Sequence, residues 1–202
     1  MNGFFKRVFD LTLSSVFLIF TFPFLLLIAV AILIDSPGQV LFGGRRVGLD
    51  GKEFDILKFR TMVDRAEVMG PAVTRENDSR VTRVGKFLRN YKLDEIPQLL
   101  NVIRGEMSLV GPRPEDPKYV AHYTPEQREV LTVLPGIASP AAVVYRNEED
   151  KLAKVPIEDL DRVYLGEILP EKLALDLEYV ENKSLILDIK VLYRAVTTVL
   201  KT

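Results

Sequence analysis

The sequence predicts a mostly helical α/β protein with a short β-hairpin, preceded by a kinked, re-entrant membrane helix. Three observations lead to this fold class. Residues 11–34 are almost continuously apolar, residues 39–42 and 53–59 are typical of short strands, and apolar residues recur at helical spacing through much of the remaining chain. The 202 residues suit one domain with an appendage, and we place the boundary between residues 1–36 and 37–202.

The apolar run at residues 11–34 is long enough to cross a bilayer, which takes about 20 such residues. Pro23 divides it into two halves that are too short to span, because proline removes a backbone hydrogen bond and kinks the helix. Lys6 and Arg7 precede the run and other basic residues follow it, so the positive-inside rule favours both ends on the cytoplasmic side. The run is too long for a signal peptide core, and no small-residue cleavage site follows it. We expect a helix that enters the membrane, breaks at Pro23 and leaves on the same face; a straight spanning helix is the alternative.

Composition narrows the classes of function. The formal net charge of -1 argues against a general nucleic-acid binder. Residues 37–113 nevertheless carry fourteen Lys and Arg against ten Asp and Glu, which suits a polyanionic substrate or an anionic lipid surface, although a solvated mixed-charge surface explains the counts equally well. The absence of Cys excludes disulfides, thiolate metal sites and a Cys nucleophile, and it fits the cytoplasm.

Local patterns predict the remaining elements in chain order. Residues 39–42 and 53–59 form the hairpin, joined through Gly43-Gly44 and the turn-forming residues 48–51. The expected elements after it are a loop at 69–79, a short basic helix at 81–89, a helix at 96–104 that Gly105 ends, an apolar run at 107–110, a rigid turn at 111–114, a helix at 125–134 that Thr124 caps, a strand at 141–145, a mostly helical stretch at 146–184 that Pro156 and Pro170 break, and an amphipathic helix from Leu185.

The C-terminal helix has an apolar stripe and a polar face. We expect the stripe to pack on the core, and a position in the membrane interface is the alternative. The stripe comprises Leu185, Ile189, Leu192, Val196 and Val199, and the opposite face carries Asp188, Lys190, Arg194 and Lys201.

Asp94 and Glu95 are the strongest candidates for chemistry. They stand directly before a helical apolar pattern, where Asp commonly serves as a helix N-cap, so a purely structural role is the first alternative. An acid pair can also hold Mg²⁺, and a carboxylate can attack phosphorus to form an acyl phosphate. No glycine-rich phosphate loop is present, so side chains would have to hold phosphates. The candidate cations are Lys58, Arg60, Arg89 and Arg113.

Four segments occur together, in order and at suitable spacing. They are KFRTM at 58–62, RVTRVG at 80–85, LDEIPQLLNV at 93–102 and GEMSLVGPRP at 105–114. The set resembles the bacterial sugar transferases, monotopic phosphoglycosyl transferases that start glycan and polysaccharide assembly. The resemblance runs from about residue 5 to the C-terminus.

The resemblance implies an enzyme of the bacterial inner membrane whose catalytic domain, residues 37–202, lies at the cytoplasmic face. It would move a sugar-1-phosphate from a nucleotide-sugar, commonly a UDP-sugar, to polyprenyl (undecaprenyl) phosphate and release UMP. Asp94 matches the family's nucleophile, Glu95 its supporting base or orienting group, and both lie where Mg²⁺ binds. Arg89 and Arg113 match positions near the phosphates, and Lys58 is a less secure match.

The partners expected from the resemblance are the nucleotide-sugar, polyprenyl phosphate and membrane lipids, with no nucleic acid, and a homodimer is left open. A Mg²⁺-dependent membrane phosphohydrolase and a non-catalytic membrane scaffold are the alternative functions. The chain departs from many relatives in having Phe22 where a serine precedes the kink proline, and in its sequence at 138–146. The sequence therefore does not name the sugar.

Overall fold

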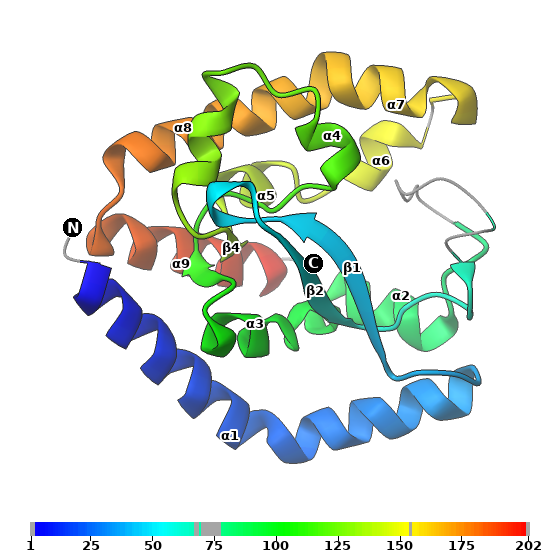
Figure 1. Ribbon diagram of the computed structural model, residues 1–202. Coiled ribbons are helices and arrows are strands. Elements are labelled where there is room, and N and C mark those ends of the chain that lie inside the picture. Colours follow the sequence, from blue (N-terminus) through cyan, green and yellow to red (C-terminus); the bar gives the residue numbers. More distant parts are fainter. Residues whose placement is uncertain (1–2, 67–68, 70–77, 154, 201–202) are drawn as a thin grey trace.

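The computed structural model describes residues 3–66, 69, 78–153 and 155–200 and is mainly helical, with two short two-stranded sheets (Figure 1). This confirms the mostly helical α/β class. The α-helices are α1 (Gly3–Asp35), α2 (Arg83–Asn90), α3 (Gln98–Arg104), α4 (Pro117–Val120), α5 (Pro140–Val144), α6 (Glu148–Leu152), α7 (Leu160–Val163), α8 (Leu169–Asn182) and α9 (Leu185–Leu200). The strands are β1 (Leu41–Val47), β2 (Glu53–Phe59), β3 (Ser108–Val110) and β4 (Gly136–Ala138). Tighter or wider helical turns are η1 (Leu49–Gly51), η3 (Leu93–Glu95), η4 (Gln127–Thr132), η5 (Ile157–Asp159) and η6 (Tyr164–Ile168).

Helix α1 continues through Pro23, so the predicted break of the helix is wrong. One proline removes a single backbone hydrogen bond, which bends a helix without having to end it. The ribbon of α1 changes direction along its length and curves beneath the rest of the chain (Figure 1). The Thr21 hydroxyl donates to the carbonyl of Phe17 at 2.7 Å, a contact that often accompanies bending. The re-entrant course through a membrane stays a prediction.

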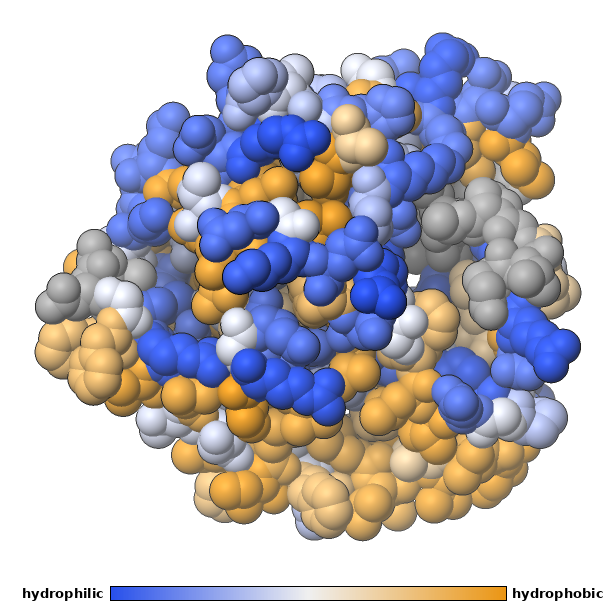
Figure 2. All heavy atoms as spheres, in the orientation of Figure 1, coloured by the Kyte–Doolittle hydropathy of each residue, from blue (hydrophilic) through white to orange (hydrophobic). Residues whose placement is uncertain are grey.

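Most of α1 faces outward. Among the described residues, α1 is the helix that is both long enough and apolar enough to cross a membrane. Only 11% of its most apolar 18-residue window is buried. Ile28 and Ile32 are exceptions, since they pack with Phe59 and Leu88. Figure 2 shows hydrophobic side chains gathered along the edge that α1 occupies, whereas the opposite part of the molecule is mostly hydrophilic. A contiguous apolar surface of this kind marks a site of contact with lipid or with an apolar partner.

A buried polar network ties the N-terminal part of α1 to the C-terminal helices. The Lys6 ammonium lies 2.8 Å from Asp10 and 3.0 Å from Asp188. Asp10 also accepts from Ser108, and Asp188 accepts from Tyr179. The pairing of both carboxylates allows them to be buried.

This network explains why the predicted orientation of α9 is wrong for Asp188 and for part of the apolar stripe, although Leu192 packs against the core as predicted. Asp188 is fully buried together with Val191, whereas Ile189 and Val196 of the predicted core stripe are 52% and 58% exposed. Helical periodicity assigns a carboxylate to the solvent face by default, but here Lys6 and Tyr179 pair with it inside. The exposed apolar side chains of α9 leave the membrane-interface alternative open.

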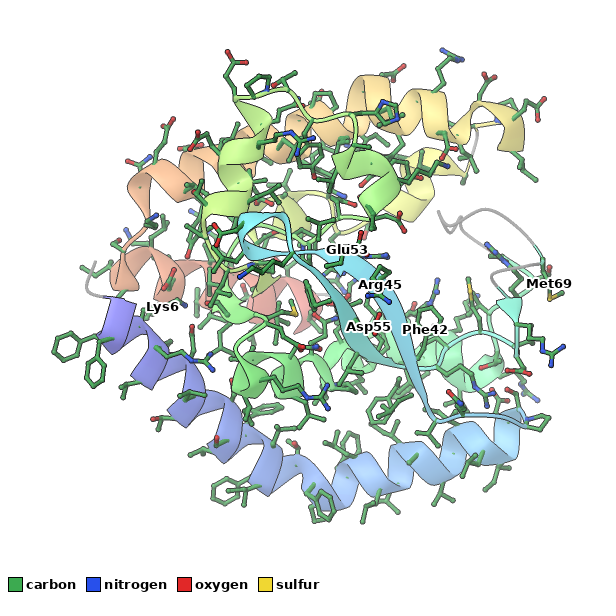
Figure 3. All side chains as sticks on the ribbon, in the orientation of Figure 1. Lys6, Phe42, Arg45, Glu53, Asp55 and Met69 are labelled. Carbon is green, nitrogen blue, oxygen red and sulfur yellow. The ribbon has the colours of Figure 1, made fainter. Side chains whose placement is uncertain are left out.

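Strands β1 and β2 form an antiparallel hairpin whose register pairs Leu41 with Phe59 and Val47 with Glu53. β2 matches the prediction, but β1 extends through Gly43 and Gly44 rather than ending before them, because that register keeps the backbone paired up to Val47. Arg45 crosses to Asp55 at 3.3 Å on the exposed face of the hairpin (Figure 3).

Strands β3 and β4 pair in parallel, and the turn at 111–114 directly follows β3. The strand predicted at 141–145 is instead helix α5. Ser139 Oγ accepts from the backbone N–H of Ala142, and Pro140 occupies the first helical turn, which is how short helices commonly begin.

The other predictions have mixed outcomes. Helix α2 matches its predicted position, with Thr82 as the cap, and Gly105 ends α3 with a φ of 86°. The predicted helix at 125–134 is the 3₁₀ turn η4, and Pro170 lies in the first turn of α8 without interrupting the preceding helical segment. Most of the predicted loop at 69–79 lies outside the described residues.

Candidate active site

Asp94 and Glu95 lie in η3, the short turn between α2 and α3. Lys92 has a left-handed φ of 54° and turns the chain after α2. Both acids are buried, with 7% and 9% of their surfaces exposed. Neither η3 nor α3 has a side-chain cap, so the helix-cap interpretation of Asp94 is wrong. The turn itself continues into the helix, because the N–H of Leu99 bonds to the carbonyl of Ile96.

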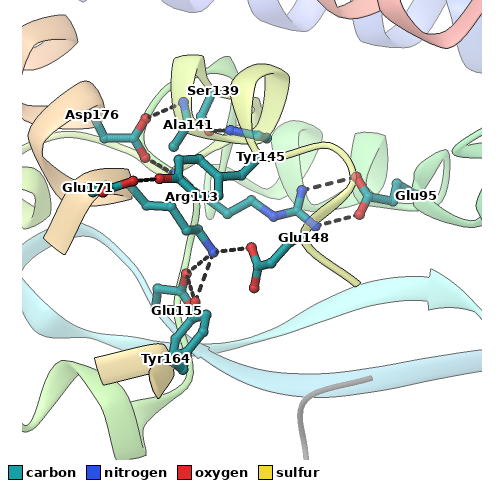
Figure 4. A network of polar contacts seen from close by, with 12 residues as sticks. Glu95, Arg113, Glu115, Ser139, Ala141, Tyr145, Glu148, Tyr164, Glu171 and Asp176 are labelled. Atoms are coloured by element: carbon teal, nitrogen blue, oxygen red, sulfur yellow. Dashed lines mark hydrogen bonds and ion pairs between the residues drawn. The ribbon is translucent and has the colours of Figure 1, made fainter. Parts of the chain in front are cut away.

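Glu95 is held by two cations from other elements. The Arg113 guanidinium donates to Oε1 at 2.5 Å and to Oε2 at 3.0 Å (Figure 4). Lys58 Nζ also donates to Oε1, at 2.9 Å. Burial works to raise the pKa of Glu95, but the charges of Arg113 and Lys58 outweigh it and hold the pKa well below its usual range. Glu95 is therefore ionised and engaged at both oxygens.

Asp94 is in the opposite electrostatic situation. Its Oδ1 is buried and has no hydrogen-bond partner among the residues that the structure describes. Burial raises the pKa of Asp94, and the charge of Glu95 adds to this, while the charge of Lys58 works against it. Two adjacent carboxylates thus have pKa values shifted in opposite directions, an arrangement that often separates two chemical roles.

Arg113 is positioned by its backbone as well as by Glu95. It follows β3 in the turn between two prolines, and its N–H donates to Asp176 Oδ2 at 2.8 Å. Asp176 Oδ1 also accepts from the N–H of Ala141 at 3.2 Å, so one carboxylate on α8 joins the turn to α5. Burial raises the pKa of Asp176 to about 6. No motif in the sequence marked this residue, since it lies 63 positions from Arg113.

The other two predicted cations point elsewhere. Arg60 is buried and donates to the carbonyls of Ser36 at 2.5 Å and Pro37 at 2.6 Å, so it joins the segment after α1 to the end of β2. Arg89 donates to the Thr61 hydroxyl at 2.9 Å and interacts electrostatically with Asp94. The structure therefore brings Lys58 and Arg113 directly to the acid pair, with Arg89 nearby and Arg60 engaged with backbone.

A cavity of about 910 Å³ opens beside the acid pair. Glu95, Lys58 and Arg113 lie in its wall, whereas Asp94 lies behind the wall, next to Leu93, which lines it. Apolar side chains of α1 and α9 line one part: Leu13, Phe17, Leu192, Ala195, Val196 and Val199. Polar side chains line another part: Glu115, Glu148, Tyr164 and Lys172. Sequence reasoning missed this polar group, because residues far apart in the chain assemble it.

The acid pair is also the place to test for a metal. Among the described residues, no group of three or more His, Asp or Glu side chains could hold a metal ion. Mg²⁺ commonly takes one or two carboxylates and completes its shell with water and substrate phosphates. The unbonded oxygen of Asp94 fits that need, whereas Glu95 would have to exchange a contact with Arg113 or Lys58. The residues thus fit Mg²⁺ held chiefly by Asp94 together with a phosphate ligand.

The family model for bacterial sugar transferases matches residues 1–202, the whole chain. The chain belongs to this family. The ordered segments around the acid pair and Arg113 had indicated it, and the prediction of the family is confirmed.

Relatives of known name agree with this assignment. The chain is 38% identical over 200 residues to a UDP-glucose:undecaprenyl-phosphate glucose-1-phosphate transferase of Caulobacter vibrioides, covering 98% of this chain and 70% of that protein. It is 36% identical to an N-acetylgalactosaminephosphotransferase of Aeromonas hydrophila that acts on undecaprenyl phosphate, covering 98% of this chain and 44% of that protein. It is also 36% identical to the exopolysaccharide production protein PSS of Rhizobium leguminosarum bv. phaseoli, covering 96% of this chain and 94% of that protein. The chain thus spans less than half of the Aeromonas protein and nearly all of the Rhizobium one.

Proposed function

We propose that this protein transfers a sugar-1-phosphate from a nucleotide-sugar, a UDP-sugar, to polyprenyl (undecaprenyl) phosphate and releases UMP. One structural observation carries the proposal: Asp94 is buried with an unbonded oxygen, beside a Glu95 that two cations engage at both oxygens. The family and the activities named for the Caulobacter and Aeromonas relatives support the reaction class.

The proposed reaction has two steps. In the first, an Asp94 oxygen attacks the sugar-bearing β-phosphorus, an O–P bond forms, and the bond from that phosphorus to the oxygen of UMP breaks. In the second, a phosphate oxygen of the polyprenyl phosphate attacks the same phosphorus, and the Asp94 carboxylate leaves. The products are UMP and a polyprenyl diphosphosugar, so charge and atoms balance across the two steps.

Asp94 suits the nucleophile better than Glu95 does. A carboxylate whose oxygens are all engaged by cations is a weak nucleophile, and Glu95 is in that state. Asp94 has a free oxygen and a raised pKa, which makes its ionised form the more basic of the two. Leu93 and Glu95, its neighbours in the chain, line the cavity, and Asp94 itself is 7% exposed, so we propose that a local shift of η3 brings its oxygen to the phosphorus.

Lys58 and Arg113 hold the substrate phosphates in this proposal. Both lie in the cavity wall, and both are oriented by Glu95 before substrate arrives. Arginine and lysine stabilise the negative charge that gathers on phosphoryl oxygens during transfer. Mg²⁺ bound to Asp94 and the diphosphate would neutralise further charge there.

The apolar part of the cavity, between α1 and α9, suits the polyprenyl chain. It is continuous with Glu95 and Arg113 in one cavity, and α1 presents a long apolar face beside it. We also propose that α1 enters and leaves the bacterial inner membrane on its cytoplasmic face. Pro23 and the curved course of α1 support this, as do the basic residues on both flanks.

Nucleotide release tests the proposal. The detergent-extracted protein is incubated with Mg²⁺, polyprenyl phosphate and a panel of UDP-sugars, and UMP is measured. We expect steady UMP release with at least one sugar only when the lipid is present, and without lipid a burst of about one UMP per enzyme. Full-rate release without lipid would instead indicate a phosphohydrolase, and no release with any nucleotide-sugar would contradict the proposed reaction.

A further inference from the structure

The polar part of the cavity contains a buried charge cluster that the two-step reaction does not use. Lys172 of α8 donates to Glu115 at 2.9 Å, to Glu148 at 3.0 Å and to the Tyr164 hydroxyl at 2.8 Å (Figure 4). Tyr164 in turn donates to Glu115 at 2.7 Å. Lys172 is only 8% exposed, yet all four side chains line the same cavity as the acid pair.

The charge balance of the cluster indicates what it can bind. Two carboxylates surround one ammonium, so the cluster is net negative and has more acceptors than donors. It therefore repels phosphate and favours an uncharged ligand with several hydroxyl donors. Only Oε2 of Glu148 takes part in the network drawn from the described residues in Figure 4, which leaves its other oxygen for a ligand.

The position of the cluster relative to Arg113 identifies which part of the substrate would reach it. Glu115 follows Arg113 by two residues, across Pro114, and interacts electrostatically with it. A diphosphate held by Arg113 and Lys58 would therefore have its neutral flanking group beside Glu115. A nucleotide-sugar has two such groups, the sugar and the nucleoside, and the sugar has more hydroxyl donors.

We infer that Glu115, Glu148, Lys172 and Tyr164 form the subsite that binds the sugar ring and discriminates between sugars. The inference rests on the proposed function, which it deepens. In this subsite the carboxylates accept from sugar hydroxyls, and Lys172 fixes the carboxylates in place and donates where a sugar oxygen replaces one of its contacts. Because epimers differ only in the direction of one hydroxyl, acceptors that Lys172 and Tyr164 hold in fixed, partly buried positions can distinguish them.

Glu148→Gln tests the inference with the smallest change. The amide keeps the shape and can still accept from Lys172, but it loses the charge that strengthens bonds to sugar hydroxyls. For the sugar that the wild type prefers, we expect kcat/KM to fall by about tenfold to a hundredfold, and the ratio of kcat/KM between epimeric UDP-sugars to move toward one. Inhibition by UMP, which lacks the sugar, is expected to stay unchanged. Glu158→Gln is the matched control, because Glu158 is exposed and lies outside the cavity wall.

Lys172→Met is the second variant, and its thermal unfolding is measured alongside. It removes the ammonium that bridges two partly buried carboxylates, so we expect lower stability as well as reduced sugar discrimination in the fraction that stays folded. Weaker UMP inhibition in Glu148→Gln would assign the cluster to the nucleoside and overturn the inference. A folded Glu148→Gln protein with the wild-type ratio of kcat/KM between epimeric UDP-sugars would overturn it too. If the wild type itself released no UMP, the proposed function would fail first, which distinguishes the two failures.

Discussion

Arg113 and Glu95 form a two-point ion pair, with nitrogen–oxygen distances of 2.5 and 3.0 Å, across 18 positions of the chain. This pair leaves Asp94 as the carboxylate with a free oxygen. It also presents a guanidinium to the cavity in a fixed orientation, ready for a phosphate. The functional asymmetry of the acid pair therefore arises from Arg113 and Lys58 rather than from the acids themselves.

A double-mutant cycle on this pair tests that relationship. Arg113→Met and Glu95→Gln are each expected to lower the free energy of unfolding by about 3 kcal/mol, because each leaves a buried charge with fewer partners. The double variant should lose less than the sum of the two, by about 0.5–3 kcal/mol. Chemical denaturation in detergent measures all four proteins. Strictly additive losses would show that the two side chains do not depend on each other.

The pH dependence of transfer should report Asp94. Its raised pKa, caused chiefly by burial, means that the ionised nucleophile is lost as pH falls through a value above the ordinary Asp range. Activity should therefore decline on the acid side at a higher pH than an exposed aspartate would give. Lys58→Met removes a charge that lowers this pKa, so the acid limb should move to higher pH, although kcat also falls. An unmoved acid limb in Lys58→Met would mean that another group controls it.

Asp176 should make stability depend on pH. Burial raises its pKa to about 6 from 3.8, so the folded state binds the proton more tightly than the unfolded state does. The free energy of unfolding from this group is then highest at low pH and falls as pH rises from about 4 through about 6, by about 3 kcal/mol in total. Asp176→Asn removes this slope, which is seen in the difference between wild type and variant across that pH range. A difference that is flat over the range would contradict the raised pKa.

The topology of α1 can be tested cleanly because the chain has no Cys. Gly3→Cys, with open space around an added Cβ, and Lys52→Cys, in the exposed hairpin turn, place single thiols at the first residue of α1 and after its end. If α1 is re-entrant, both label with a membrane-impermeant reagent from the cytoplasmic side only. Labelling from opposite sides would establish a spanning helix. The unmodified chain serves as the unlabelled control.

The sequence predicts elements best where local chemistry decides them. Strand β2, helix α2 with its Thr82 cap and the Gly105 terminus of α3 match because turns, caps and periodicity specify them within a few residues. Segment 141–145 was mistaken for a strand because its apolar run fits either structure, and Ser139-Pro140 decides for a helix.

The parts of the site that escaped prediction depend on long-range contacts. Arg60 was a candidate phosphate-binding cation like Lys58, but it lies just beyond the end of β2, and its side chain bonds to the carbonyls of Ser36 and Pro37 instead. Asp176 and Lys172 contact Arg113 and Glu115 only because α8, which carries both, packs against the turn that holds those two residues. The buried position of Asp188 likewise depends on Lys6, at the other end of the chain.

The covalent intermediate is the most direct test of the proposed mechanism. The protein is incubated with its preferred UDP-sugar and Mg²⁺ without lipid acceptor, quenched, digested and analysed by mass spectrometry. We expect a sugar-phosphate adduct on Asp94 that disappears when polyprenyl phosphate is added, and neither adduct nor UMP release in an Asp94→Asn variant that stays folded. An adduct on Glu95, or steady transfer to lipid by folded Asp94→Asn protein, would contradict the assignment of Asp94 as the nucleophile.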